Sequence, residues 1–167
     1  MKHLFLVRHA KSSWDEPGLT DIERPLNNRG KKDAPFMGKI IAAKKFKPDL
    51  IISSPAQRAR KTAIAFADEF DMKKKEILLD EKIYEATSSE LLEIIRNIDK
   101  DFKSVMLFGH NPGLTNLNNT LSHKYIDNIP TCGIVALKFE EDWKDIKPKS
   151  AVQEFFEYPK LHGKRED

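Results

Sequence analysis

Short apolar runs alternate with longer amphipathic segments along this chain, and the alternation restricts the folds that it can adopt. Runs typical of buried β-strands lie at residues 4–7, 49–54, 76–79, 104–110 and 133–140. Segments with apolar residues at helical spacing lie at 28–43, 55–70, 88–98 and 111–122. Strands alternating with helices predict an α/β fold, a three-layer sandwich with a mostly parallel central sheet and helices on both faces. An amphipathic stretch at 151–158 is a candidate edge strand.

Local signals indicate where the helices begin. Ser54 is the expected N-cap of the second helical segment. Ser88 or Ser89 is expected to cap the third. In the first segment, Pro35 predicts a kink or a late start, because proline cannot donate a backbone hydrogen bond inside a helix.

Polar clusters follow three of the predicted strands at the point where each strand ends. Arg8 and His9 follow the first strand, "SSPAQRARKT" with Arg58 follows the second, and "GHNPG" with His110 follows the fourth. In open α/β sheets, ligands bind outside the carboxyl ends of the strands. We therefore expect these four basic side chains to converge at one edge of the sheet.

The converging groups suit a phosphoryl group. Two guanidiniums offer planar, paired donors for phosphate oxygens, and the helix N-termini expected near residues 54–55 and 111–112 add backbone N–H donors. The side chain able to attack phosphorus is a histidine, because the sequence contains no Cys-x5-Arg loop, Ser-His-Asp order or Walker-type loop. Nearby positive charge helps to keep an imidazole unprotonated and therefore nucleophilic.

Each signal also has an ordinary structural interpretation. A histidine after a strand is most often a turn residue, and "GHNPG" alone fits a plain turn. A metal site built on His9 and His110 lacks a third ligand at suitable spacing, so we expect neither a metal nor another cofactor. The lysine-rich stretches "KKFK" and "MKKKE" lack an aromatic stacking platform, which argues against nucleic acid as a partner. Only the shared position of the three clusters at the strand ends indicates a site.

The segments "LVRHAKSSW", "SSPAQRARKT", "IYEA" and "GHNPG" together resemble the histidine phosphatase superfamily, which has the phosphoglycerate mutase-like fold. The short length and the segment "ERPLNNRGKKDA" are similar to the compact SixA-type phosphohistidine phosphatase branch. The resemblance runs from residue 1 to about residue 140, in order. One departure is Ala10, which stands where the family more often has glycine and which reduces backbone freedom at the turn.

The resemblance implies a role for each of the converging residues. His9 is the expected nucleophile, which forms a phosphohistidine intermediate. Arg8 and Arg58 are expected to bind the phosphoryl oxygens, and His110 to neutralise the transition state. His110 is followed by Asn111, so the His-acid dipeptide of the acid phosphatase branch is absent, which argues against broad acid phosphatase activity.

A carboxylate between residues 76 and 88 is expected to be the proton donor. Glu85 is our choice, with Glu81 and Asp80 as alternatives, and an exposed glutamate without a role explains Glu85 about equally well.

Other residues near the strand ends are candidates for the rim of the site. Ser12 and Asn111 are predicted to contact the substrate, and Lys11 is a further candidate. Thr131, in "PTCG", could bond near His9, although a plain turn into the last buried strand is the favoured interpretation.

The predicted loops at the strand ends are short, and the longest, at 10–27, is mostly polar. This points to an open site that suits a phosphorylated protein side chain, and we expect a metal-independent phosphohydrolase acting on a phosphoprotein, most plausibly on phosphohistidine. The alternatives are a small-molecule phosphomonoesterase, a mutase-like enzyme, and a phosphate-binding module without turnover.

The length of 167 residues fits one domain, expected at 1–160, with a frayed tail at 161–167. The single cysteine, Cys132, excludes an internal disulfide framework and suits a reducing compartment. No run approaches the ~20 apolar residues of a membrane span, and the first apolar run is too short for a signal peptide. We therefore expect a cytoplasmic protein without a membrane partner, and a monomer.

Overall fold

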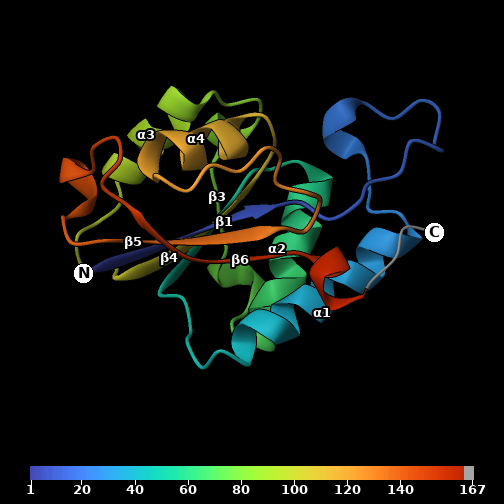
Figure 1. Cartoon of the computed structure of the whole chain (residues 1–167). Coiled ribbons are helices and arrows are strands. Elements are labelled where there is room, and N and C mark those ends of the chain that lie inside the picture. The colour runs from blue at the N-terminus through green and yellow to red at the C-terminus, as the bar shows by residue number, and fades with distance from the viewer. Residues whose placement is uncertain (164–167) are drawn as a thin grey trace.

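The computed structural model describes residues 1–163, and within them the strands form a six-stranded sheet covered by helices on both faces (Figure 1). The strands are β1 (Lys2–Arg8), β2 (Leu50–Ser53), β3 (Leu78–Leu79), β4 (Ser104–Gly109), β5 (Ile134–Phe139) and β6 (Val152–Glu157). The α-helices are α1 (Asn28–Ala42), α2 (Gln57–Glu69), α3 (Ser88–Arg96) and α4 (Gly113–Leu121). This is the predicted α/β architecture.

The strand order is β3-β2-β4-β1-β5-β6, with β1 in the interior of the sheet. The pairs β1–β4, β2–β4 and β2–β3 are parallel, whereas β5 runs antiparallel to β1 and β6 runs antiparallel to β5. The predicted mostly parallel sheet is confirmed, and the candidate edge strand is β6.

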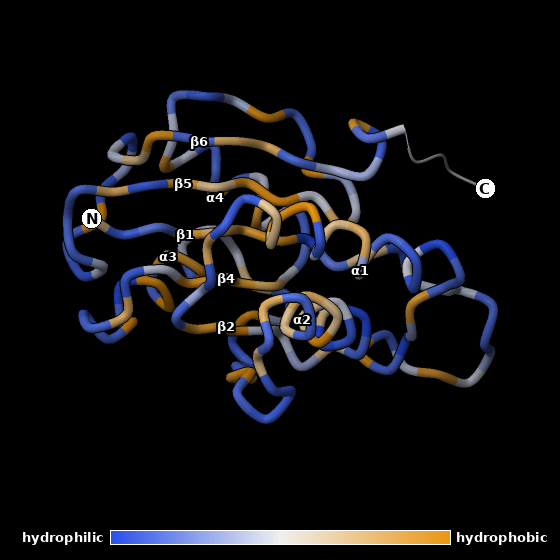
Figure 2. The backbone as a smooth tube through the Cα atoms, turned by 90° about the horizontal axis from the view of Figure 1, so that it is seen from below, coloured by the Kyte–Doolittle hydropathy of each residue, from blue (hydrophilic) through white to orange (hydrophobic). Residues whose placement is uncertain are grey.

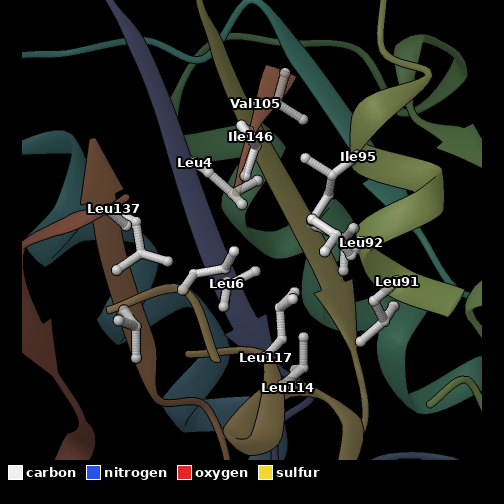
Figure 3. Close-up of a cluster of buried hydrophobic side chains, with 14 of the residues drawn as sticks. Leu4, Leu6, Leu91, Leu92, Ile95, Val105, Leu114, Leu117, Leu137 and Ile146 are labelled. Atoms are coloured by element: carbon white, nitrogen blue, oxygen red, sulfur yellow. The ribbon is translucent and has the colours of Figure 1, made fainter. Parts of the chain in front are cut away.

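Both faces of β1 are buried, because its side chains point alternately to two cores. Leu4 and Leu6 belong to the core under α3 and α4 (Figure 3). Phe5 and Val7 belong to the core on the other face, under α1 and α2. Figure 2 shows the resulting pattern, in which apolar residues are concentrated in the strands and polar residues in the connecting loops.

The first helix starts where the sequence pattern begins, in spite of Pro35. Helix α1 runs from Asn28 and contains Pro35 in its interior, so the alternative of a late start is wrong. The side chain of Asn27 accepts a hydrogen bond from the N–H of Gly30 over 2.8 Å and caps the helix. This cap, together with the burial of Met37 and Ile41, offsets the cost of proline.

Two predicted caps are wrong. Helix α2 has Ala56 as its N-cap, and the Ser54 hydroxyl accepts instead from the N–H of Ala56 over 3.1 Å. Helix α3 is capped by Thr87, whose hydroxyl accepts from the N–H of Glu90 over 3.2 Å. The Glu90 carboxylate in turn accepts from the N–H of Thr87 over 3.0 Å. Such a capping box requires a glutamate three residues after the cap, and Thr87 meets that requirement.

The end of the described chain is a 3₁₀ helix at Pro159–His162, which includes the first residues of the predicted tail. Residues 164–167 of that tail lie outside the described residues. No helix within 1–163 is both long and apolar enough to cross a membrane.

Two leucines of the sheet, one buried and one largely exposed, test how much burial in the core stabilises the fold. Leu107 on β4 is fully buried, whereas Leu78 on β3 is 52% exposed. We expect Leu107→Ala to lower the free energy of unfolding by about 2–5 kcal/mol through lost burial and a residual cavity, and Leu78→Ala to lower it by less than about 1 kcal/mol. Urea denaturation of both variants measures the difference. Equal losses would contradict the assignment of β4 to the core.

Candidate active site

Strand pairing brings the polar ends of β1 and β4 together. Arg8 lies opposite Gly109 in the parallel register, and the N–H of His9 donates to the carbonyl of Gly109 over 3.2 Å. His110, the residue after Gly109, therefore lies beside His9, with ring centroids 5.3 Å apart.

The His9 ring is oriented by its own backbone turn. The ring is buried, at 8% exposure, and its Nδ1 lies 2.8 Å from the carbonyl oxygen of Ala10. A carbonyl only accepts, so Nδ1 carries the proton and the neutral ring has its lone pair on Nε2. No hydrogen bond from the described residues reaches that Nε2.

The pKa of His9 is lowered to about 3, chiefly by burial and in addition by His110, Arg58 and Arg8, against the opposing effect of the Ala10 carbonyl. Burial also lowers the pKa of His110 to about 4, with Arg58 as the next cause. Both rings are therefore neutral at pH 7, as a nucleophile requires.

Ala10 is accommodated without backbone strain. It is fully buried, and its backbone is outside the left-handed region that would favour glycine. Its N–H donates to the hydroxyl of Thr62 over 3.0 Å, and that hydroxyl donates to the carbonyl of Arg58 over 2.8 Å. These bonds fix the turn after β1 to the first part of α2.

The two arginines are held differently. Arg58, in the first turn of α2, is 7% exposed. Its Nη1 donates to the backbone carbonyl of Asp21 over 2.7 Å, and its Nη2 donates to the Asp21 carboxylate over 3.0 Å. Arg8 donates from Nη1 to the carbonyl of Ile129 over 2.9 Å.

Two buried nitrogen atoms of this group lack a hydrogen-bond partner among the described residues. They are Nε of Arg8 and Nδ1 of His110. On its other side, His110 bonds the Ser54 hydroxyl through Nε2 at 2.8 Å. Unpaired buried nitrogens are costly and are tolerated chiefly at functional sites.

Asp21 and Tyr84 also lie in the site, although neither is among the residues predicted from the sequence. Asp21 lies in the short 3₁₀ helix η1 (Asp21–Glu23), and its carboxylate accepts from Arg58, from Arg24 and from the hydroxyl of Tyr84. Those hydrogen bonds, that from Tyr84 foremost, hold the pKa of Asp21 well below its usual range. The Tyr84 ring meets His110 edge-on, with centroids 5.6 Å apart. The motif "IYEA" is the sequence signal for Tyr84, because it contains this tyrosine next to the candidate acid Glu85.

The candidate proton donors lie in the segment between β3 and α3. Glu85 is exposed and has a backbone φ of 58°, a left-handed conformation that is strained for a side-chain-bearing residue. Its neighbour Tyr84 is the residue that contacts His110. Glu81 is exposed, and the carboxylate of Asp80 accepts from the N–H of Lys82 over 2.9 Å. Glu85 remains our prediction for the proton donor.

The predicted rim residues are engaged in structural bonds. Ser12 is buried, and its hydroxyl accepts from Nη2 of Arg24 over 2.6 Å. Asn111 donates to the carbonyl of Ile129 over 2.9 Å, and its side-chain oxygen accepts from the Thr115 hydroxyl over 2.8 Å. Contact of Ser12 or Asn111 with substrate remains a prediction.

The turn before β5 supports the end of β1. The N–H of Cys132 donates to the carbonyls of Arg8 and His9, over 3.1 and 3.0 Å. Burial raises the pKa of the Cys132 thiol, which stays protonated and is therefore no rival nucleophile. The Thr131 hydroxyl accepts from Nη2 of Arg29 over 3.2 Å. Within 1–163, no group of three or more His, Cys, Asp or Glu side chains could hold a metal ion.

Comparison with known proteins identifies the family to which this chain is similar. The model of the histidine phosphatase superfamily (branch 1) matches residues 4–108. An uncharacterised chloroplast protein of Arabidopsis thaliana is 31% identical over 153 residues, which cover 86% of this chain and 70% of that protein. Phosphoserine phosphatase 1 of Hydrogenobacter thermophilus is 33% identical over 87 residues, 51% of this chain and 39% of that enzyme.

A solved structure from Agrobacterium tumefaciens, provisionally named the phosphohistidine phosphatase SixA, is similar over almost the whole chain. It superposes with a TM-score of 0.79 at 29% identity and covers 95% of this chain and 98% of its own. The match supports the phosphoglycerate mutase-like fold predicted from the sequence.

The low pKa of His9 predicts acid sensitivity of the fold. A histidine in the unfolded chain titrates near 6.5, whereas the pKa of folded His9 is about 3. Below pH 6.5 the unfolded state binds a proton that the folded state does not, so the free energy of unfolding decreases as the pH is lowered. From pH 7 to pH 5 we expect His9 to contribute a loss of about 2 kcal/mol, which His9→Gln removes. Urea denaturation at both pH values measures it.

The matched control is His123→Gln, because His123 is exposed and follows the C-terminal end of α4, whereas His110 precedes the other end of that helix. That variant should keep the pH dependence of the wild type. If His9→Gln keeps it as well, His9 is not buried in the neutral form.

Proposed function

The chain belongs to the histidine phosphatase superfamily and is a phosphatase, and from this premise we propose that it is a metal-independent phosphohydrolase that dephosphorylates phosphohistidine side chains of proteins. The observation that carries the proposal is the free Nε2 of a neutral, buried His9 beside Arg8, Arg58 and His110. A lone pair aimed from a ring fixed at Nδ1, with positive charge around it, is what transfer of a phosphoryl group requires.

In the first step, Nε2 of His9 attacks phosphorus. A P–N bond forms to His9 while the bond from phosphorus to the leaving group breaks, and the leaving group takes a proton from the general acid, for which Glu85 is our candidate. The guanidiniums of Arg8 and Arg58 balance the charge on the three equatorial oxygens, and the neutral ring of His110 is positioned to donate a hydrogen bond to them. Catalysis is then mostly positioning and charge stabilisation.

In the second step, water attacks the phosphohistidine. Water gives one proton to the carboxylate that the first step left, and the new P–O bond replaces the P–N bond, which yields orthophosphate and returns His9 to its neutral form. The bond from Nδ1 to the Ala10 carbonyl holds the ring in one orientation through both steps.

Two observations favour a protein substrate. The chain covers 98% of the SixA structure of A. tumefaciens and so has a similar compact size. The segments of the chain that follow β2 and β4 pass into helices within a few residues, so neither inserts a domain over the site. The P–N bond of phosphohistidine is also labile, so that a weakly placed acid such as exposed Glu85 suffices.

Hydrolysis of a small phosphomonoester is the second candidate. It is favoured by the similarity of about half of this chain to phosphoserine phosphatase 1 of H. thermophilus. An alkoxide leaving group needs a proton more than an imidazole does, so this activity depends on a competent acid.

A covalent intermediate on His9 is expected during turnover. After rapid quenching with a ³²P-labelled phosphohistidine protein, the wild type should carry a label that is acid-labile and alkali-stable. His9→Ala should carry none and should lose turnover, whereas His123→Ala should keep both. Label retained in His9→Ala would contradict the assignment, and no label with no turnover on phosphohistidine, phosphoserine or simple esters would leave only a phosphate-binding module.

Glu85→Gln tests the proton donor with two esters. For phosphoserine, whose leaving group needs a proton, we expect kcat to fall roughly 100-fold. For p-nitrophenyl phosphate, whose leaving group is stable as an anion, kcat should change little. Glu81→Gln is the matched control and should leave both rates unchanged. A loss on phosphoserine in Glu81→Gln alone would transfer the role to Glu81.

A further inference from the structure

One residue, Asp21, accepts hydrogen bonds from both terminal nitrogens of Arg58. Nη1 donates to the backbone carbonyl of Asp21 over 2.7 Å, and Nη2 donates to its carboxylate over 3.0 Å. The same nitrogens are the donors with which an arginine forms paired hydrogen bonds to a phosphoryl group. The carboxylate matches that group in charge sign and in acceptor geometry.

The Asp21 carboxylate lies inside the site. The hydroxyl of Tyr84 donates to the same Oδ2 atom that Arg58 contacts, and the Tyr84 ring is edge-on to His110. The negative charge of Asp21 also raises the pKa of His110, against the effect of Arg58. Asp21 is thus close enough to the catalytic ring to oppose a second anion there.

The backbone near Asp21 is held in place by hydrogen bonds from Arg24. Arg24 donates to the Asp21 carboxylate over 3.1 Å, to the carbonyl of Ser13 over 3.1 Å and to the hydroxyl of Ser12 over 2.6 Å. The guanidinium of Arg24 also stacks on Trp14, 3.1 Å from the ring centroid. In Figure 1 this segment, in blue, extends beyond the sheet edge at which β1 ends. The Asp21 side chain is 48% exposed, so it can turn into solvent without disturbing the core.

We propose that the Asp21 carboxylate is a resident competitor that must leave Nη2 of Arg58 before a phosphoryl group forms a hydrogen bond to that nitrogen, and that it thereby sets the affinity of the site for phosphate. The proposal rests on the phosphohydrolase function proposed above. The apparent affinity for a phosphoryl group is reduced by the fraction of molecules in which Asp21 holds Arg58. After hydrolysis, return of the carboxylate to Arg58 helps to displace orthophosphate.

An alternative role makes the opposite prediction. If Asp21 only positioned Arg58, its removal would loosen the guanidinium and weaken phosphate binding. A resident competitor, in contrast, strengthens phosphate binding when it is removed.

The test is titration calorimetry of the full chain with orthophosphate at pH 7.5. Asp21→Asn keeps the size of the side chain and removes its charge, and we expect it to lower the Kd for orthophosphate roughly tenfold, as when a competing state near 90% occupancy is removed. Tyr84→Phe keeps the ring against His110 and removes one donor to the carboxylate, so it should lower the Kd by a smaller factor. Glu16→Gln, an equal change of charge at an exposed position of the same segment, should leave the Kd unchanged.

An unchanged or higher Kd in Asp21→Asn, with His9 still labelled during turnover, would overturn this inference alone. A Kd that falls equally in Glu16→Gln would overturn it too, because net charge would then be the cause. If neither the wild type nor Asp21→Asn binds orthophosphate and His9 takes no label, the proposed function fails together with the inference.

Discussion

The parallel register of β1 with β4 is the constraint on which the site depends. It sets Arg8 opposite Gly109, so that the next residues, His9 and His110, leave the sheet side by side with ring centroids 5.3 Å apart. A slip of one residue would turn one side chain to the opposite face and separate the two rings. On its other side, β4 pairs with β2, which leads through Ser54 into the helix that carries Arg58.

Burial makes His9 a neutral nucleophile, and it also leaves polar atoms of the site without hydrogen-bond partners within residues 1–163. His9 is buried and His110 is half-buried, both beside two guanidiniums, and this keeps His9 neutral with a free lone pair on Nε2. The same arrangement leaves Nε of Arg8 and Nδ1 of His110 without partners among the described residues. A fold selected for stability alone would pair such atoms. Buried nitrogens without partners, next to histidines with lowered pKa values, therefore indicate a functional site.

The central fold and four basic residues were predictable from the sequence, because each depended on local pattern and on one topological rule. Leu4 to Val7 read as a buried strand, and parallel strands deliver the residues that follow them to one edge. Asp21 and Tyr84 were not predictable in this way. Their positions depend on the path of the segment between β1 and α1, which is fixed by tertiary bonds from Arg24 and Arg58 that leave no period in the sequence. The cap at Ala56 could not be predicted, because alanine has no side-chain acceptor, whereas the cap at Thr87 was missed although Glu90 completes its capping box.

The most direct test of the account is the structure of the protein with orthovanadate, which mimics phosphorus during transfer. We expect vanadium bonded to Nε2 of His9, with its equatorial oxygens on Arg8, Arg58 and His110. Vanadate held without a bond to His9, or bound through another side chain, would contradict the assignment of His9 as the nucleophile.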